Sequence, residues 1–206
     1  AYKKEGPKWR IQKKGGGDAS KAVSKKGKLL IILFLLSFIV KLVFVVNYGG
    51  GVKYPDSELY LEYAKNVAEN GEYSVVRMGQ KVRAFRPPVY PLFLAFNRII
   101  FGKNLFYPRL FQIIFSLLIS YLIYLILEYH IKSKYSFYIA AFSLFYPTLI
   151  YYTAPILTEM IFGLLLLAGF YFYLNYRVSK SKMDIILSGF FWGLAGLTKS
   201  FIFFLP

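Results

Sequence analysis

The sequence contains no cysteine, which excludes disulfide bonds and thiolate chemistry of every kind. It also lacks the glycine-rich and Walker patterns that cradle nucleotide phosphates, and the Cys/His spacing that is typical of zinc sites. Negative charge is scarce, because 10 Asp and Glu stand against 26 Lys and Arg in 206 residues. Five of these acidic residues lie between Tyr54 and Phe101. That stretch is therefore the first place to look for acid chemistry.

Apolar residues, by contrast, are abundant and come in long runs. The chain is 57% hydrophobic and 20% aromatic, with a mean hydropathy of +0.46, which is too apolar for an ordinary soluble domain. The net charge of +16 suggests nucleic acid at first sight. However, the cations cluster at the ends of the apolar runs, which is how membrane proteins place them. We therefore predict a membrane protein with no nucleic-acid partner.

Five apolar segments have about the length that a bilayer core requires, the third being the shortest. They comprise residues 29–46, 107–127, 137–152, 157–176 and 184–206. The pattern predicts an all-α, multi-pass transmembrane protein. Lys41 interrupts the first segment, and it can either extend toward the membrane surface or face other helices.

The distribution of basic residues predicts the orientation of these segments. Residues 1–28 are expected to form a basic, flexible cytoplasmic tail, and the short connections 128–134 and 177–182 also carry Lys and Arg. Basic short loops stay inside, so the long loop 47–106 is expected outside. The region 29–206 then forms one transmembrane domain.

The outer loop contains two predicted amphipathic or interfacial helices. Apolar residues recur at helical spacing after Asp56, and Gly71 is a reasonable C-terminal cap for that helix. A second apolar segment of about ten residues follows Arg86-Pro87-Pro88, and it is too short to cross a bilayer.

Four ionisable residues from separate segments converge on this predicted outer side. They are Asp56 and Arg86 of the loop, Glu159 at the start of the fourth segment, and Lys199 near the outer end of the fifth. Charges in or beside membrane spans are costly and are usually functional. Each also has a structural interpretation. Asp56 can be a helix N-cap, and Arg86 can anchor the loop to a lipid phosphate. Glu159 can be a charge that interacts favourably with the dipole of its helix, and Lys199 can extend to the membrane surface.

The residues of the outer loop resemble those of GT-C glycosyltransferases, with the protein O-mannosyltransferase group and the lipid A aminoarabinose transferases as the nearest likenesses. The loop pattern reads Asp56-Ser57-x-x-Tyr60-Leu61-x-x-Ala64-x-Asn66, Gly71-x-Tyr73 and Arg86-Pro87-Pro88-x-Tyr90-Pro91-Leu92-Phe93-Leu94-Ala95. Further matches are Phe101-Gly102, Arg109-Leu110, Leu157-Thr158-Glu159 and Gly193-Leu194-Ala195-Gly196-Leu197-Thr198-Lys199.

The resemblance implies a GT-C-like fold and a membrane enzyme that transfers a sugar from a polyprenyl-phosphate carrier to an acceptor hydroxyl at the outer or lumenal leaflet. Asp56 matches the catalytic base, and Glu159 is expected to orient the acceptor or assist the base. Arg86 matches the position that holds the carrier phosphate, and Lys199 is expected to share this work. Tyr60 and Arg109 belong to the same pattern and are expected to bind substrate.

The expected partners are a polyprenyl-phosphate-linked sugar, an acceptor protein or glycolipid, and membrane lipids. No cofactor is expected. A divalent metal, which oligosaccharyltransferase relatives hold at similar acids, is not favoured because two separate carboxylates offer few ligands. The favoured location is the plasma (inner) membrane of a prokaryote rather than the endoplasmic reticulum.

Two further expectations concern the extent of the chain and its class. Family members are about twice as long or more, so the chain resembles the N-terminal part of such an enzyme. The alternative function is a transporter or flippase-like protein for lipid-linked or anionic substrates, which would use the same cations for passage.

Overall fold

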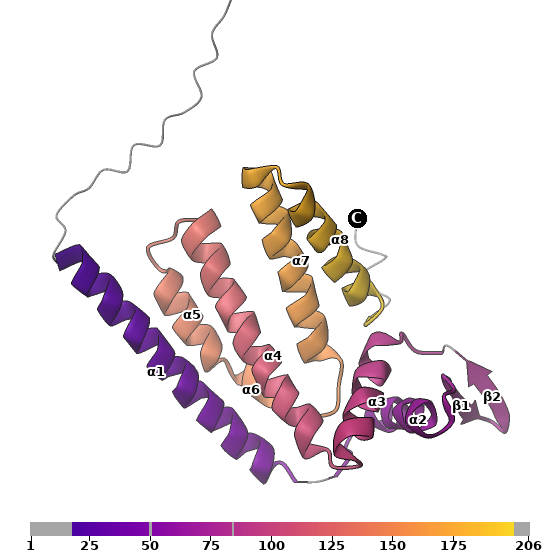
Figure 1. Cartoon of the computed structure of the whole chain (residues 1–206). Coiled ribbons are helices and arrows are strands. Elements are labelled where there is room, and N and C mark those ends of the chain that lie inside the picture. The colour runs from indigo at the N-terminus through magenta and orange to yellow at the C-terminus, as the bar shows by residue number, and fades with distance from the viewer. Residues whose placement is uncertain (1–17, 50, 84, 200–206) are drawn as a thin grey trace, which may run out of the picture.

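The computed structural model of the protein describes residues 18–49, 51–83 and 85–199 (Figure 1). This part of the chain is mostly helical. In order, the elements are α1 (Asp18–Asn47), α2 (Pro55–Asn70), β1 (Ser74–Arg77), β2 (Gln80–Arg83), α3 (Val89–Phe101), α4 (Phe106–Leu125), the π-helical turn η1 (Ile126–His130), α5 (Ser136–Leu144), α6 (Pro147–Tyr151), α7 (Glu159–Ser179) and α8 (Lys182–Gly196).

Three stretches of helix are long and apolar enough to cross a membrane. Within the described residues they are Lys26–Asn47, Phe106–His130 and Glu159–Ser179. Large apolar side chains on the outward face of α1, such as Ile31 and Leu35, are exposed, as expected for a helix that borders lipid. The prediction of an all-α, multi-pass membrane protein is confirmed.

The predicted third span, residues 137–152, is not one helix in the structure. It is divided into α5 and α6, and neither is long enough to cross a bilayer. Pro147 has no N–H to continue a helix and disfavours helical geometry in the residue before it. Tyr146 is accordingly extended, with φ −63° and ψ 124°.

The two ends of the predicted membrane domain also differ from expectation. Helix α1 begins at Asp18, so the part of the basic tail that is described is already helical, while residues 1–17 lie outside the described residues. Helix α8 begins at Lys182 and ends at Gly196, and residues 200–206 of the predicted fifth span lie outside the described residues.

Lys41 faces the protein rather than extending to the membrane surface. Its side chain is fully buried in α1, and Nζ donates a hydrogen bond to Ser37 Oγ at 2.9 Å. Ser37 Oγ in turn donates to the carbonyl of Leu144, the last residue of α5, at 2.7 Å. The cation thus lies beside the negative end of a helix dipole, where it is favourable.

The helices run alternately along the bundle, and α2, α3 and the hairpin lie together at one end (Figure 1). The last turn of α1 and the first turns of α4 and α7 lie at this end, and α8 runs back toward it. A buried cluster joins α2 to α3 through Tyr60, Ala64, Tyr90 and Leu94. The described part of loop 47–106 therefore lies at one end of the bundle, and the side of the membrane that it faces stays a prediction.

A two-stranded antiparallel hairpin follows α2 and was not predicted from the sequence. Strands β1 and β2 pair with Val75 opposite Val82, and Val75 is fully buried against α2. The turn residues Met78 and Gly79 both have positive φ, 51° and 73°, which is the backbone form that suits a two-residue hairpin turn. The predicted cap of α2 is confirmed, since Gly71 is left-handed and its N–H bonds to Val67 O.

Candidate active site

A cavity of about 350 Å³ lies where α2, the segment before α3, the start of α7 and the end of α8 meet. Its lining includes five of the six side chains singled out from the sequence, together with two threonines. They are Asp56, Tyr60, Arg86, Thr158, Glu159, Thr198 and Lys199. Segments more than a hundred residues apart in the sequence thus contribute to one polar site.

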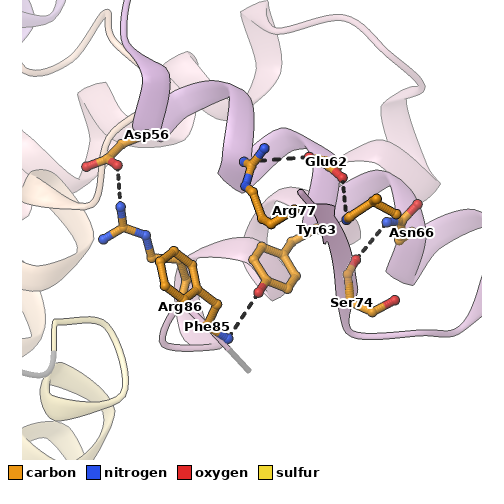
Figure 2. A network of polar contacts seen from close by, with 9 residues as sticks. Asp56, Glu62, Tyr63, Asn66, Ser74, Arg77, Phe85 and Arg86 are labelled. Carbon is orange, nitrogen blue, oxygen red and sulfur yellow. Dashed lines mark hydrogen bonds and ion pairs between the residues drawn. The ribbon is translucent and has the colours of Figure 1, made fainter. Parts of the chain in front are cut away.

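The first acid–cation pair of the cavity joins α2 to the segment before α3. Arg86 Nη2 donates to Asp56 Oδ1 at 2.5 Å (Figure 2). Asp56 is the second residue of α2, and the N-cap is Tyr54, so the carboxylate does not serve as the N-cap. Its side chain is 50% exposed and that of Arg86 is 33% exposed, so a ligand in the cavity can reach both.

The second pair joins α7 to the segment that follows α8. Lys199 Nζ lies 2.8 Å from Glu159 Oε1, and Glu159 is the first residue of α7. The Lys199 ammonium also lies 5.8 Å from the centre of the Phe162 ring, within range of a cation–π contact. A backbone hydrogen bond from Val89 N–H to Leu197 O, at 3.1 Å, ties this end of α8 to the start of α3. The two pairs therefore line the same cavity.

The two carboxylates and the two cations of the cavity balance in charge, but not all of their hydrogen-bonding atoms have partners. Glu159 Oε2 and Arg86 Nε are both buried, and neither has a hydrogen-bond partner among the described residues. A buried polar atom without a partner costs about 1–3 kcal/mol. A ligand that accepts from Arg86 and donates to Glu159 would recover that cost. A phosphate beside a hydroxyl has this combination of groups.

Two tyrosines fix the backbone on either side of Arg86. Phe85 N–H donates to Tyr63 Oη at 3.1 Å (Figure 2), and Tyr73 Oη donates to Arg86 O at 2.8 Å. The two phenol rings stack with their centres 4.5 Å apart. Burial raises the pKa of Tyr73, so its hydroxyl keeps the proton that it donates. Sequence reasoning missed both tyrosines, although Tyr73 belongs to the quoted loop pattern.

The hairpin supports the same region from α2. Glu62 of α2 accepts from Val76 N–H at 3.1 Å and pairs with Arg77 at 3.7 Å, and Asn66 Nδ2 donates to Ser74 O at 2.7 Å (Figure 2). These contacts hold the hairpin against the helix that carries Asp56. The segment that follows the hairpin carries Arg86, which lines the cavity.

Tyr60 lines the cavity together with the two acid–cation pairs. It is buried on α2, one helical turn after Asp56, and its ring lies 6.0 Å from the Arg86 guanidinium carbon. Burial raises the pKa of Tyr60. The hydroxyl therefore stays protonated at neutral pH and can donate a hydrogen bond to a bound ligand.

Arg109, the sixth predicted site residue, lies outside this cavity lining. It is buried on α4, where Nε donates to Ala154 O at 2.8 Å and Nη1 donates to Gly49 O at 2.8 Å. Nη2 also donates to Gly51 O at 3.3 Å. These bonds join the segment after α1 to the segment before α7. In the structure, Arg109 thus connects loops that surround the site.

A further buried connection runs through Gln112 of α4. Tyr90 Oη of α3 donates to Gln112 Oε1 at 2.7 Å, and Gln112 Nε2 donates to Thr153 O and Pro155 O, both at 2.9 Å. This network links the helix that follows Arg86 to the loop that precedes Glu159. Gln112 gave no sequence signal, because a polar residue in an apolar run does not reveal its partners.

The structure thus defines an integral, multi-pass membrane protein with a polar cavity at one end of its helix bundle. A comparison with protein families matches residues 85–206, more than half of the chain, to the dolichyl-phosphate-mannose-protein mannosyltransferase family. The chain belongs to this family, whose members are glycosyltransferases with a lipid-phosphate sugar donor, and the resemblance stated from the sequence is confirmed. The matched range includes Arg86, Glu159 and Lys199, whereas Asp56 and Tyr60 precede it. Comparisons with curated proteins and with solved structures gave no match.

Proposed function

We propose that the protein transfers a sugar from a polyprenyl-phosphate carrier to a hydroxyl of an acceptor protein or glycolipid, at the outer or lumenal leaflet. The observation that carries this proposal is the pairing of Asp56 with Arg86 and of Glu159 with Lys199 around one cavity. A carboxylate and a phosphate-binding cation are the two groups that such a transfer needs side by side.

In the proposed step, the acceptor oxygen attacks the anomeric carbon of the sugar as its bond to the phosphate oxygen breaks. Asp56 takes the proton of the acceptor hydroxyl, and the bonding electrons leave with the polyprenyl phosphate. Because the leaving phosphate is already anionic, it requires cations rather than a strong acid. Arg86 and Lys199 supply this charge, and preorganised donors of this kind contribute about 3–4 kcal/mol each.

The pairing of Arg86 with Asp56 couples donor binding to the base. A guanidinium has five N–H donors in a fixed fork, so Arg86 can hold phosphate oxygens while one nitrogen stays near Asp56. The buried Nε, which has no partner among the described residues, is available for this contact. The carrier phosphate then lies beside the carboxylate that takes the proton.

Glu159 is proposed to bind a hydroxyl of the acceptor or of the sugar through Oε2, while Oε1 stays on Lys199. Tyr60, which keeps its proton, is proposed to donate to a phosphate or sugar oxygen. The transporter alternative lacks comparable support, since Lys41, a charge buried within a span, is bound to Ser37 and lies outside the cavity lining.

The test of this proposal is Asp56→Asn, assayed with polyprenyl-phosphate mannose and with other polyprenyl-phosphate sugars. If Asp56 is the base, transfer should fall about a hundredfold to ten-thousandfold while carrier binding changes little. The matched control is Glu58→Gln, because Glu58 is exposed on the same turn of α2 and lies outside the cavity lining. Near-native turnover in Asp56→Asn would refute the role of this carboxylate.

A further inference from the structure

A second cavity lies at the opposite end of the bundle from Asp56, between the start of α1, the end of α4 with η1, and the start of α5. Its volume is about 520 Å³. It forms where α4 passes into the π-helical turn η1 and the chain then reverses direction through Lys132, whose φ is 54°. Figure 1 shows α5 between α1 and α4 at this level.

The charge of this second cavity is predominantly positive. Its lining contains three exposed lysines, Lys26, Lys132 and Lys134, and one acidic residue, Glu128. The Lys134 ammonium lies 5.0 Å from the centre of the Tyr135 ring. Glu128 Oε2 already accepts a hydrogen bond from Ser136 Oγ. An anion in the cavity would therefore meet an excess of cations. The first turn of α5 adds the positive end of a helix dipole, which also favours negative charge.

The position of the cavity relative to the spans identifies the kind of anion. The first membrane-length stretch begins at Lys26 and the second ends at His130, so the cavity lies at the boundary between hydrocarbon and headgroups. Its lining also includes the apolar side chains Leu30 and Phe137, next to the lysines. Cations beside apolar side chains at this depth suit a phosphate that is attached to acyl chains.

We propose that this cavity binds the phosphate headgroup of an anionic phospholipid from the leaflet at that end of the bundle. The lysines contact the phosphate oxygens, and the apolar part of the lining contacts the beginning of an acyl chain. This site is separate from the cavity around Asp56. The proposal therefore does not depend on the sugar transfer proposed above.

The test measures lipid retention by the full chain in detergent, using native mass spectrometry with phosphatidylglycerol and with phosphatidylcholine of the same acyl chains. We expect preferential retention of phosphatidylglycerol. The variant Lys132→Gln/Lys134→Gln should lower its affinity at least about tenfold, since a lysine near an anionic headgroup contributes about a fivefold factor. The control Lys180→Gln/Lys182→Gln removes the same charge from the other turn at this end of the bundle, outside the cavity, and should keep the affinity.

Three outcomes would overturn the proposal. Equal losses in the two double variants would show general attraction to the surface rather than a site. Full competition by glycerol 3-phosphate would assign the cavity to a soluble phosphate compound. A third measurement needs no variant: photoactivatable phosphatidylglycerol should label the unaltered protein between Tyr124 and Phe137, and labelling that favoured residues 177–182 would contradict the site.

Discussion

Arg86 bonds to Asp56 through one nitrogen of a guanidinium that carries two more, and one of those two is buried without a partner among the described residues. The same residue thus contacts the proposed base and has donors left for a phosphate. Lysine at this position would offer a point charge in place of a planar fork. The exact geometry of this side chain is therefore expected to matter for the reaction as well as for binding.

Substitution of Arg86 distinguishes a phosphate ligand from a membrane anchor. Arg86→Lys should weaken carrier binding modestly, because the charge remains but the fork is lost. Arg86→Ala should weaken it strongly and should also lower turnover at saturating donor, because charge on the leaving phosphate is then less stabilised. The measurement is transfer rate against the concentration of purified polyprenyl-phosphate sugar.

Arg83→Ala provides the matched control, since Arg83 is an exposed cation at the end of β2, outside the cavity lining. Its transfer rate should remain near that of the unaltered protein. If Arg86→Ala keeps full turnover at saturating donor, Arg86 has a structural role and Lys199 becomes the principal phosphate ligand.

Individual residues of the cavity could be predicted from the sequence because charges in an apolar chain are rare. Asp56, Arg86, Glu159 and Lys199 stood out for this reason, and the structure places all four around one cavity. Their pairing could not be predicted, since an ion pair depends on side-chain geometry between distant segments. The role of Tyr63 and Tyr73, which bond to the backbone beside Arg86, could not be predicted because aromatic residues are common throughout this chain.

At the scale of helices, the site depends on the spacing between α3, α4 and the loop before α7. Gln112 sets this spacing through three buried hydrogen bonds, to Tyr90, Thr153 and Pro155. Among the described residues, none of these hydrogen bonds goes to a residue proposed to contact substrate. We therefore regard it as a positioning residue for the loop that carries Glu159.

Gln112→Leu should destabilise the protein by about 2–4 kcal/mol, because it leaves two carbonyls and the Tyr90 hydroxyl buried without their present partner. The thermal unfolding midpoint in detergent should fall, and the remaining folded protein should bind acceptor more weakly. The control Gln80→Leu alters an exposed glutamine of β2. Equal midpoints for the two variants would show that the Gln112 network does not hold these elements together.

The contact between α7 and α8 depends on the absence of a side chain at Gly169. A Cβ there would lie 2.3 Å from Trp192 Cδ1, and Trp192 Nε1 donates to Leu166 O at 3.2 Å. Gly169→Ala must therefore displace the indole or the helix, which typically costs about 1–3 kcal/mol and exceeds the gain of up to about 1 kcal/mol in helix propensity. The thermal unfolding midpoint should fall.

Gly189→Ala is the control for this pair of helices, since a Cβ at Gly189 meets nothing within 4 Å. Its midpoint should stay equal or rise slightly because alanine favours the helix. If the unfolding midpoint of Gly169→Ala is equal to or higher than that of Gly189→Ala, the Trp192 side chain can move aside without a loss of stability.

Helix types and several boundaries could also be predicted, whereas breaks and hairpins could not. The 3.6-residue spacing of apolar residues after Asp56, together with Gly71 at the end of that segment, correctly predicted α2. Pro147 carried the signal for the break in the predicted third span, but the apolar run around it outweighed that signal in a length-based assignment. The hairpin was missed because its turn, Met78-Gly79, has a single glycine and its strands are only four residues long.

For the whole molecule, the two cavities lie at opposite ends of the bundle, so we expect them on opposite sides of the membrane. Loop 47–106 is predicted outside, and the connections 128–134 and 177–182 are predicted inside. The alternating course of α1, α4, α7 and α8 is compatible with this arrangement (Figure 1). The orientation is a prediction of its own, and a measurement in cells tests it.

Single cysteines can decide the orientation, since the sequence has no cysteine of its own and every label must then come from the inserted thiol. Met78→Cys places a thiol on the fully exposed hairpin turn, and Lys134→Cys places one in the exposed connection before α5. A membrane-impermeant maleimide should label Met78→Cys in intact cells and leave Lys134→Cys unlabelled. Both should react after permeabilisation, which controls for expression and accessibility. If only Lys134→Cys is labelled in intact cells, the orientation is the reverse of the predicted one, and the proposed sugar transfer would take place on the cytoplasmic side.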